Sequence, residues 1–335
     1  MKSTVTQKMG LSFIYGILGF FVFLDKYGMA FYSISLNFAR LFALFFIFGS
    51  FLSFTTKLLV KPGEMFDYMF YYPIYENYGL TIRQKLPNKI AEVPVPAITA
   101  ESAIAVDVTS SKVLFELNPD KQLPPASTTK VMTFLTAYDL YKADQKLEVL
   151  SDCTMLDSQK AGFYPQEQVS VKDLYYALLI NSAGDAAYTL SAQDPQFISL
   201  MNKKAQVLGL SSTRFSNAVG FDNYEAQVST ARDLVKLGIV AMQNSLTRDI
   251  VKTKTLQINS SGTPHILTNT NKLLWEVPES VGLRTGTTDG AGEVLIYMYE
   301  TDNKRIAIVV MQSSDRFSDT KKILDWVLKS YTWEI

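Results

Sequence analysis

Ser127 and Lys130 are the residues of this sequence whose types and spacing could do chemistry most directly. Residues three apart on a helix lie on one face, so the two side chains can touch. A serine hydroxyl becomes a good nucleophile at neutral pH when a neighbouring base takes its proton. The run 131–138 is apolar on nearly every side, which predicts a buried helix. Burial disfavours a charged ammonium, so a neutral lysine could serve as that base, and free N–H groups at the helix start could stabilise an oxyanion.

The same S-x-x-K spacing recurs at Ser318 and Lys321 near the C-terminus. This second copy lies in a polar turn between charged residues, a pattern that is typical of a helix cap followed by solvated lysines. The spacing alone therefore does not identify a nucleophile. The apolar helix behind Ser127 and the motifs further along the chain distinguish the first copy from the second.

The composition excludes several classes of function. The chain has 335 residues, with 32 Lys plus Arg and 32 Asp plus Glu, so no basic excess is available to bind nucleic acid. The single cysteine, Cys153, excludes an intrachain disulfide, and the single histidine, His265, leaves no histidine cluster for a metal. We expect no metal and no cofactor. A histidine-based serine hydrolase would depend on His265 in a polar stretch, without any G-x-S-x-G motif.

Two uncharged apolar segments in residues 1–60 predict a membrane-anchoring region, with candidate spans at 9–24 and 41–59. Their apolar cores of roughly 16 residues give about 24 Å of helix, less than the ~30 Å hydrocarbon core. Arg40 and Lys57 flank the second segment and can snorkel, which makes it the better span. Positive charges are spread evenly around both segments, so the positive-inside rule does not orient them.

The remainder divides into a spacer at 61–96, rich in Pro and Tyr, and a globular domain at 97–335. β-rich hairpin patterns lie at both ends of the domain, and helical patterns lie between them. This pattern predicts one sheet built from both ends of the domain. The predicted fold is α/β (α+β), with an antiparallel sheet, flanking helices and a mostly helical subdomain. The predicted strands are 102–108, 112–117, 293–300 and 304–312, and the predicted helices are 171–180, 185–191, 195–208, 229–244 and 315–331.

Two later stretches complete a set of three motifs. Residues 178–187 contain Asn181-Ser182-Ala183-Gly184, and residues 282–289 contain Arg284-Thr285-Gly286-Thr287. Their order after Ser127 is that of S-x-x-K, an S-D-N variant and K-T-G in penicillin-recognising serine enzymes. Together with flanking stretches, the chain from about Pro96 to its C-terminus resembles the D-alanyl-D-alanine carboxypeptidases of the low-molecular-mass penicillin-binding protein group, peptidase family S11. The flanks that carry this resemblance are 123–126, 169–174, 215–222 and 229–234.

The resemblance implies a serine β-lactamase/transpeptidase-like fold and a role for each motif residue. Ser127 would be the acylated nucleophile, Lys130 its base, and Ser182 the proton relay to the leaving amine. The substrate's terminal carboxylate would bind Arg284, Thr285 and Thr287. The backbone N–H groups of Ser127 and Thr287 would form the oxyanion hole, and Gly286 would leave room for substrate along the strand edge.

Two positions depart from the family pattern. Arg284 stands where the family usually has lysine, which keeps the charge but adds bulk and a group that rarely gives up its proton. Gly184 stands where the family usually has asparagine, so a carboxamide that normally contacts the substrate and the active-site lysine is missing. From the sequence alone, we expect asparagine at position 184 to raise turnover.

The resemblance implies a membrane-anchored serine D-Ala-D-Ala carboxypeptidase that removes the terminal D-alanine from peptidoglycan stem peptides through an acyl-enzyme. β-Lactams would be covalent inhibitors, and the catalytic domain would lie on the extracytoplasmic side. Two alternatives stay open: a D,D-endopeptidase that cuts cross-links, and a penicillin-binding sensor or scaffold without turnover. A class A β-lactamase is disfavoured because no E-x-x-L-N loop supplies a deacylating carboxylate.

Overall fold

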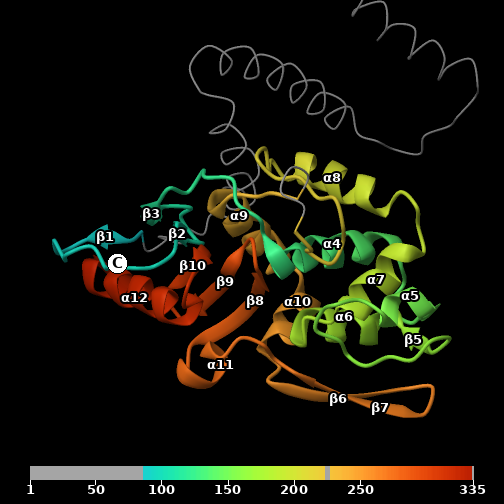
Figure 1. Ribbon diagram of the computed structural model, residues 1–335. Coiled ribbons are helices and arrows are strands. Elements are labelled where there is room, and N and C mark those ends of the chain that lie inside the picture. Colours follow the sequence, from blue (N-terminus) through green and yellow to red (C-terminus); the bar gives the residue numbers. More distant parts are fainter. Residues whose placement is uncertain (1–85, 223–226, 334–335) are drawn as a thin grey trace, which may run out of the picture. The chain divides into compact units, whose positions relative to one another are not determined.

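The computed structural model describes residues 86–222 and 227–333 of the chain (Figure 1). The candidate membrane segments 9–24 and 41–59 lie outside the described residues, as does most of the predicted spacer. Within the two described ranges, no helix combines the length and the apolar character needed to cross a membrane.

A five-stranded antiparallel sheet forms the centre of the domain, in the order β3-β2-β10-β9-β8. β2 near the start of the domain pairs with β10 near its end, with Ala105 opposite Ile308. The prediction that both ends of the domain build one sheet is therefore confirmed. The strands are β2 (Ser102–Asp107), β3 (Val113–Leu117), β8 (Ser280–Thr288), β9 (Gly292–Glu300) and β10 (Arg305–Ser313).

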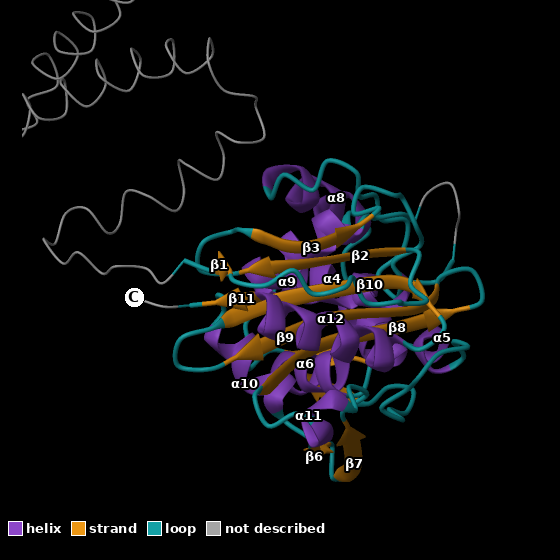
Figure 2. Ribbon diagram, turned by 90° about the vertical axis from the view of Figure 1, so that its left-hand side faces the viewer, coloured by secondary structure: helices purple, strands orange, loops and turns teal. Residues whose placement is uncertain are grey.

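Successive side chains of a strand point to opposite faces of the sheet, and here both faces are buried. Along β2, Ile104 and Val106 join the core on the side of the helical subdomain, while Ala103 and Ala105 join the core under the C-terminal helix. Figure 2 shows the sheet with helices on its two sides. The strands are therefore apolar at nearly every position rather than at alternate ones.

The helices fall into three groups. The helical subdomain contains α4 (Lys130–Leu140), α5 (Ser151–Thr154), α6 (Val171–Ile180), α7 (Gly184–Ala192) and α8 (Phe197–Val207). Two helices follow it in the chain, α9 (Ala231–Ala241), which packs on β10 and β2, and α10 (Ser245–Lys252), which packs on β8. The opposite face of the sheet carries α11 (Leu273–Glu276) and α12 (Arg316–Ser330).

The predicted helix 229–244 is shorter in the structure, where α9 spans Ala231–Ala241. The Thr230 side chain accepts the N–H of Asp233 at 3.1 Å and caps α9. Asn244 has an extended backbone, and its Oδ1 accepts the N–H groups of Leu246 and Thr247. Asparagine is a favoured N-cap, so a separate helix, α10, begins at Ser245, directly after the stretch that the sequence pattern predicts as helix.

Three small two-stranded sheets surround the centre: β1 (Asn88–Lys89) with β11 (Tyr331–Thr332), β4 (Lys146–Glu148) with β5 (Gln168–Ser170), and β6 (Thr255–Ser260) with β7 (Thr263–Thr268). β1 lies within the stretch assigned to the spacer, and Trp326 Nε1 donates to the carbonyl of Val93 at 3.0 Å. The last residues of that stretch therefore pack on the domain.

On β7, His265 is buried, and its Nε2 lies 2.8 Å from Glu167 Oε1.

Candidate active site

Ser127 lies in a single 3-10 turn, η2 (Ala126–Thr129), that leads directly into α4. Ala126, one residue before it, has a φ of 48°, in the left-handed region that an alanine adopts at an energetic cost. A Cβ added to Gly286 would lie 2.8 Å from the backbone nitrogen of Ser127, and one added to Gly220 would lie 2.1 Å from the carbonyl oxygen of Ala126. Two glycines thus let β8 and the 217–221 turn approach the backbone of Ser127 from separate elements.

Lys130 is fully buried, and its Nζ lies 2.8 Å from Ser127 Oγ and 2.7 Å from the carbonyl oxygen of Val219. Burial holds the pKa of the Lys130 amine well below its usual value. The charge of Arg284 lowers this pKa further, while Asp185 acts in the opposite direction. A neutral amine has two N–H groups and a lone pair, so it can donate to Val219 and still accept the serine proton.

Arg284 is also buried, with 1% of its surface exposed. Its Nε donates to the carbonyl of Ser127 at 3.2 Å, and its Nη1 donates to the carbonyl of Leu179 at 3.4 Å. Burial, helped by the charge of Arg316, lowers the pKa of Arg284 to about 9. The side chain does not line the cavity, which differs from the contact with a substrate carboxylate expected from the sequence. Its position beneath the nucleophile suits an electrostatic role toward Lys130.

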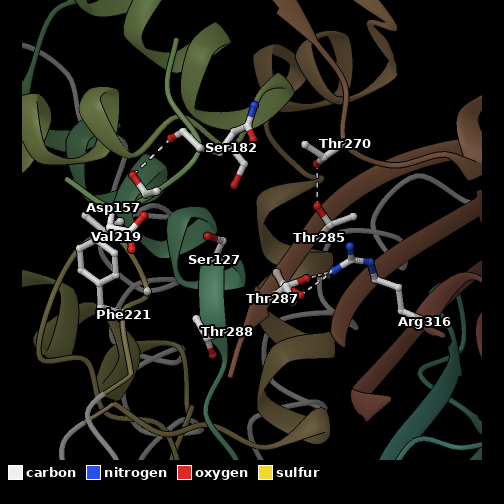
Figure 3. Close-up of a pocket in the computed structure, with 14 residues that line it drawn as sticks. Ser127, Asp157, Ser182, Val219, Phe221, Thr270, Thr285, Thr287, Thr288 and Arg316 are labelled. Atoms are coloured by element: carbon white, nitrogen blue, oxygen red, sulfur yellow. Dashed lines mark hydrogen bonds between the residues drawn. The ribbon is translucent and has the colours of Figure 1, made fainter. Parts of the chain in front are cut away.

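A cavity of about 290 Å³ opens at Ser127. Figure 3 shows Ser127 at its centre and Ser182 beside it. Ser182 lies in the turn between α6 and α7 with a φ of 62°. The structure thus brings Ser127, Ser182, Thr285, Gly286 and Thr287 to one cavity, as the motifs predict. The other lining residues are Asp157, Ser158, Gln159, Val219, Gly220, Phe221, Thr270, Thr288 and Arg316.

Arg316 is a residue of the cavity that the sequence does not single out. Its Nη1 lies 2.6 Å from the carbonyl oxygen of Gly286 and 2.6 Å from Thr287 Oγ1 (Figure 3). On the same strand, Thr285 Oγ1 lies 2.6 Å from Thr270 Oγ1. Arg316 is the first residue of α12 and belongs to no local motif, so only the packing of α12 against the sheet brings it to the cavity.

Asp185 binds the backbone of a loop that forms part of the cavity wall. Its carboxylate is buried and accepts the backbone N–H groups of Ala161, Gly162 and Phe163 at 3.0 to 3.3 Å. It also accepts the N–H of Ala186 at 2.9 Å. The sequence favours helix capping for this residue. The structure adds a role in holding the 157–163 loop, whose first residues line the cavity.

Gly184 contacts the same loop, and its N–H donates to the carbonyl of Gln159 at 2.7 Å. A Cβ added at Gly184 would lie 2.0 Å from Ser158 Oγ and 2.9 Å from Ser158 Cβ. The expectation that asparagine at position 184 raises turnover therefore does not fit this geometry, because the loop already fills the space.

Comparisons with known proteins agree with this fold. A family model described as D-alanyl-D-alanine carboxypeptidase matches residues 88–315. The chain is 35% identical over 256 residues to D-alanyl-D-alanine carboxypeptidase DacC of Escherichia coli, covering 70% of this chain and 62% of DacC. It is 33% identical over 247 residues to the D-alanyl-D-alanine endopeptidase of E. coli, covering 69% of this chain and 78% of that protein.

Among solved structures, the Streptomyces K15 DD-transpeptidase superposes with a TM-score of 0.68 at 28% identity, covering 71% of this chain and all of that one. The fold is therefore that of the class of proteins to which this DD-transpeptidase belongs. The chain belongs to the D-alanyl-D-alanine carboxypeptidase family, peptidase S11. It spans less than two thirds of the length of DacC.

Proposed function

We propose that this protein is a serine-type D-Ala-D-Ala carboxypeptidase that removes the terminal D-alanine from peptidoglycan stem peptides. The observation that carries the proposal is the 2.8 Å contact between Lys130 Nζ and Ser127 Oγ at the base of the cavity. Membership of the S11 family supports the same reaction.

The reaction takes two steps. Ser127 Oγ attacks the carbonyl carbon of the penultimate D-alanine while its proton passes to Lys130 Nζ. The backbone N–H groups of Ser127 and Thr287 stabilise the oxyanion, and collapse of the intermediate breaks the C–N bond. The departing amine takes a proton through Ser182, and free D-alanine leaves. Water then hydrolyses the ester, which restores the Ser127 hydroxyl and releases the shortened peptide.

The substrate carboxylate is assigned to the wall formed by Thr285, Thr287 and Arg316. Arginine offers two parallel N–H donors to a carboxylate, and the two hydroxyls add further donors. Gly286 lies between the two threonines, and its lack of a side chain lets the backbone of Ser127 pack closely against β8. Arg284 supports this site from beneath and stays charged at neutral pH, since its pKa is about 9.

A second candidate is D,D-endopeptidase activity on peptidoglycan cross-links. The observation that favours it is the similarity to the E. coli D-alanyl-D-alanine endopeptidase, of which this chain covers 78%. The acylation step is the same in both reactions, and the two differ only in the group that leaves. A non-turnover sensor would stop at the acylated serine.

The location of the site follows from the same proposal. Peptidoglycan lies outside the cytoplasmic membrane, so the catalytic domain would face outward, and residues 41–59, with or without 9–24, would anchor it. The support for this anchor is the apolar character of those segments in the sequence.

The test uses the purified full-length protein, a fluorescent penicillin and a pentapeptide ending in D-Ala-D-Ala. We expect covalent labelling that disappears in Ser127→Ala, and release of one D-alanine per peptide. Labelling that persists in Ser127→Ala would overturn the assignment of the nucleophile. Stable labelling without D-alanine release would favour the sensor, and cleavage of a cross-linked dimer but not of the pentapeptide would favour the endopeptidase.

A further inference from the structure

The cavity wall opposite Arg316 includes a loop segment, Asp157–Gln159, that none of the three motifs includes. In Figure 3, Asp157 lies on one side of Ser127 and Arg316 on the other. A peptide whose carboxylate is held by Arg316 and whose scissile carbonyl lies over Ser127 must therefore extend its acyl side toward this loop. This reasoning rests on the proposed function.

Ser158 occupies the space that a side chain at position 184 would need. Its Oγ lies 2.0 Å, and its Cβ 2.9 Å, from the ideal Cβ position of Gly184. Real Cβ atoms do not approach other heavy atoms so closely, so Ser158 or its loop must shift to admit a side chain at position 184. The loop thus places a hydroxyl on the cavity wall at the position where α7 begins without a side chain.

The backbone that follows Ser158 is held by several hydrogen bonds. Gly184 N–H donates to the carbonyl of Gln159 at 2.7 Å, and Asn181 Nδ2 donates to the carbonyl of Lys160 at 2.7 Å. Asp185 then binds the N–H groups of residues 161–163. The loop backbone next to Ser158 is thereby held close to Ser182, because the same short segment, 181–185, carries Ser182 and all three anchoring residues.

The Ser158 hydroxyl keeps capacity for another partner. Within the described residues, it donates to the carbonyl of Gln159 over a long 3.3 Å contact. A hydroxyl has one donor and two acceptor positions, so it can pair with either half of a peptide group. Ser158 is half-buried and lines the cavity. A substrate amide in the cavity would occupy the hydrogen-bonding positions of the hydroxyl that no group of the described residues uses.

We propose that Ser158 is a substrate-binding residue that hydrogen-bonds a backbone amide on the acyl side of the peptide, in place of a side chain at position 184. The two residues act together: Gly184 leaves space beside α7, and the loop places the Ser158 hydroxyl in that space. The proposed contact with the substrate therefore depends on both residues.

The test compares Ser158→Ala with a matched control, Ser191→Ala, in the full-length protein. Ser191 lies on α7, bonds the carbonyl of Tyr188 in its own helix at 3.1 Å, and does not line the cavity. We expect Ser158→Ala to lower kcat/KM for the D-Ala-D-Ala peptide about 3- to 10-fold, the loss typical of one neutral hydrogen bond. Its Tm and its penicillin labelling at Ser127 should be retained. The control should match the parent in every measurement.

A second set of variants tests the pairing itself. Gly184→Ala should lower both Tm and kcat/KM, because the new Cβ meets Ser158. Adding Ser158→Gly should restore Tm toward that of the parent but leave kcat/KM at the level of Ser158→Ala, since the hydroxyl is absent. This non-additivity is what a double-mutant cycle measures.

Unchanged kcat/KM in Ser158→Ala, with normal labelling of the parent, would overturn this inference and leave the proposed function intact. An unaffected Gly184→Ala would do the same. A parent protein that is neither labelled nor active on the peptide would overturn the proposed function and this inference together.

Discussion

The amine of Lys130 and the backbone carbonyl of Val219 lie 2.7 Å apart, although the two residues are 89 positions apart in the chain. This bond fixes the amine where it also meets Ser127 Oγ at 2.8 Å. The carbonyl belongs to a turn in which Asn217 Oδ1 accepts the N–H groups of Val219, Gly220 and Phe221. The orientation of the Lys130 amine therefore depends on the 217–221 turn, which supplies none of the proposed catalytic side chains.

The rate of acylation should rise with pH with a midpoint well below 10.5, the ordinary pKa of lysine. The base is neutral Lys130, and a lowered pKa makes that form available at lower pH. Arg284→Gln removes a positive charge that lowers this pKa, so the midpoint should move to higher pH. Arg284→Lys keeps the charge and is the matched control. The measurement is the rate of fluorescent penicillin labelling across pH, and equal midpoints in Arg284→Gln and the parent would contradict the prediction.

Arg316→Gln should lower kcat/KM for a peptide with a free terminal carboxylate about 10- to 100-fold, the range for a hydrogen bond to a charged group. A peptide with an amidated C-terminus should be affected far less, because it offers no carboxylate to bind. Arg305→Gln serves as the control, since Arg305 is 58% exposed and pairs with Glu300. Equal losses on the two peptides would show that Arg316 acts through the fold rather than through the carboxylate.

Asp185→Asn should destabilise the loop that carries Ser158. The buried carboxylate accepts N–H groups from residues 161–163, and an amide would present its own NH₂ group to some of these donors. A loss of about 2 kcal/mol corresponds to a fall in Tm of roughly 4–8 °C for a domain of this size. Calorimetry or thermal fluorescence measures the shift. Asp139→Asn, an exposed member of a surface pair with Lys204, should leave Tm nearly unchanged. A similar Tm for both variants would rule out this role of Asp185.

The sequence by itself determined the class of the fold and the first members of the site. Both hairpin patterns became neighbouring strands, because alternating or continuous apolar runs bounded by turn residues are local signals. The helix at 171–180 has the predicted bounds. The proximity of Ser127 and Lys130 was predictable for the same reason, since it depends only on a short local stretch, a 3-10 turn that leads into α4.

Only the tertiary structure decided which cation faces the cavity and what fills the space beside Gly184. Arg284 carries the motif position but is buried under the nucleophile, while Arg316 reaches the cavity from a helix outside all three motifs. Ser158 meets Gly184 across 26 positions of sequence that form a loop, β5 and α6. Contacts of this kind depend on how whole elements pack, and local spacing contains no information about them.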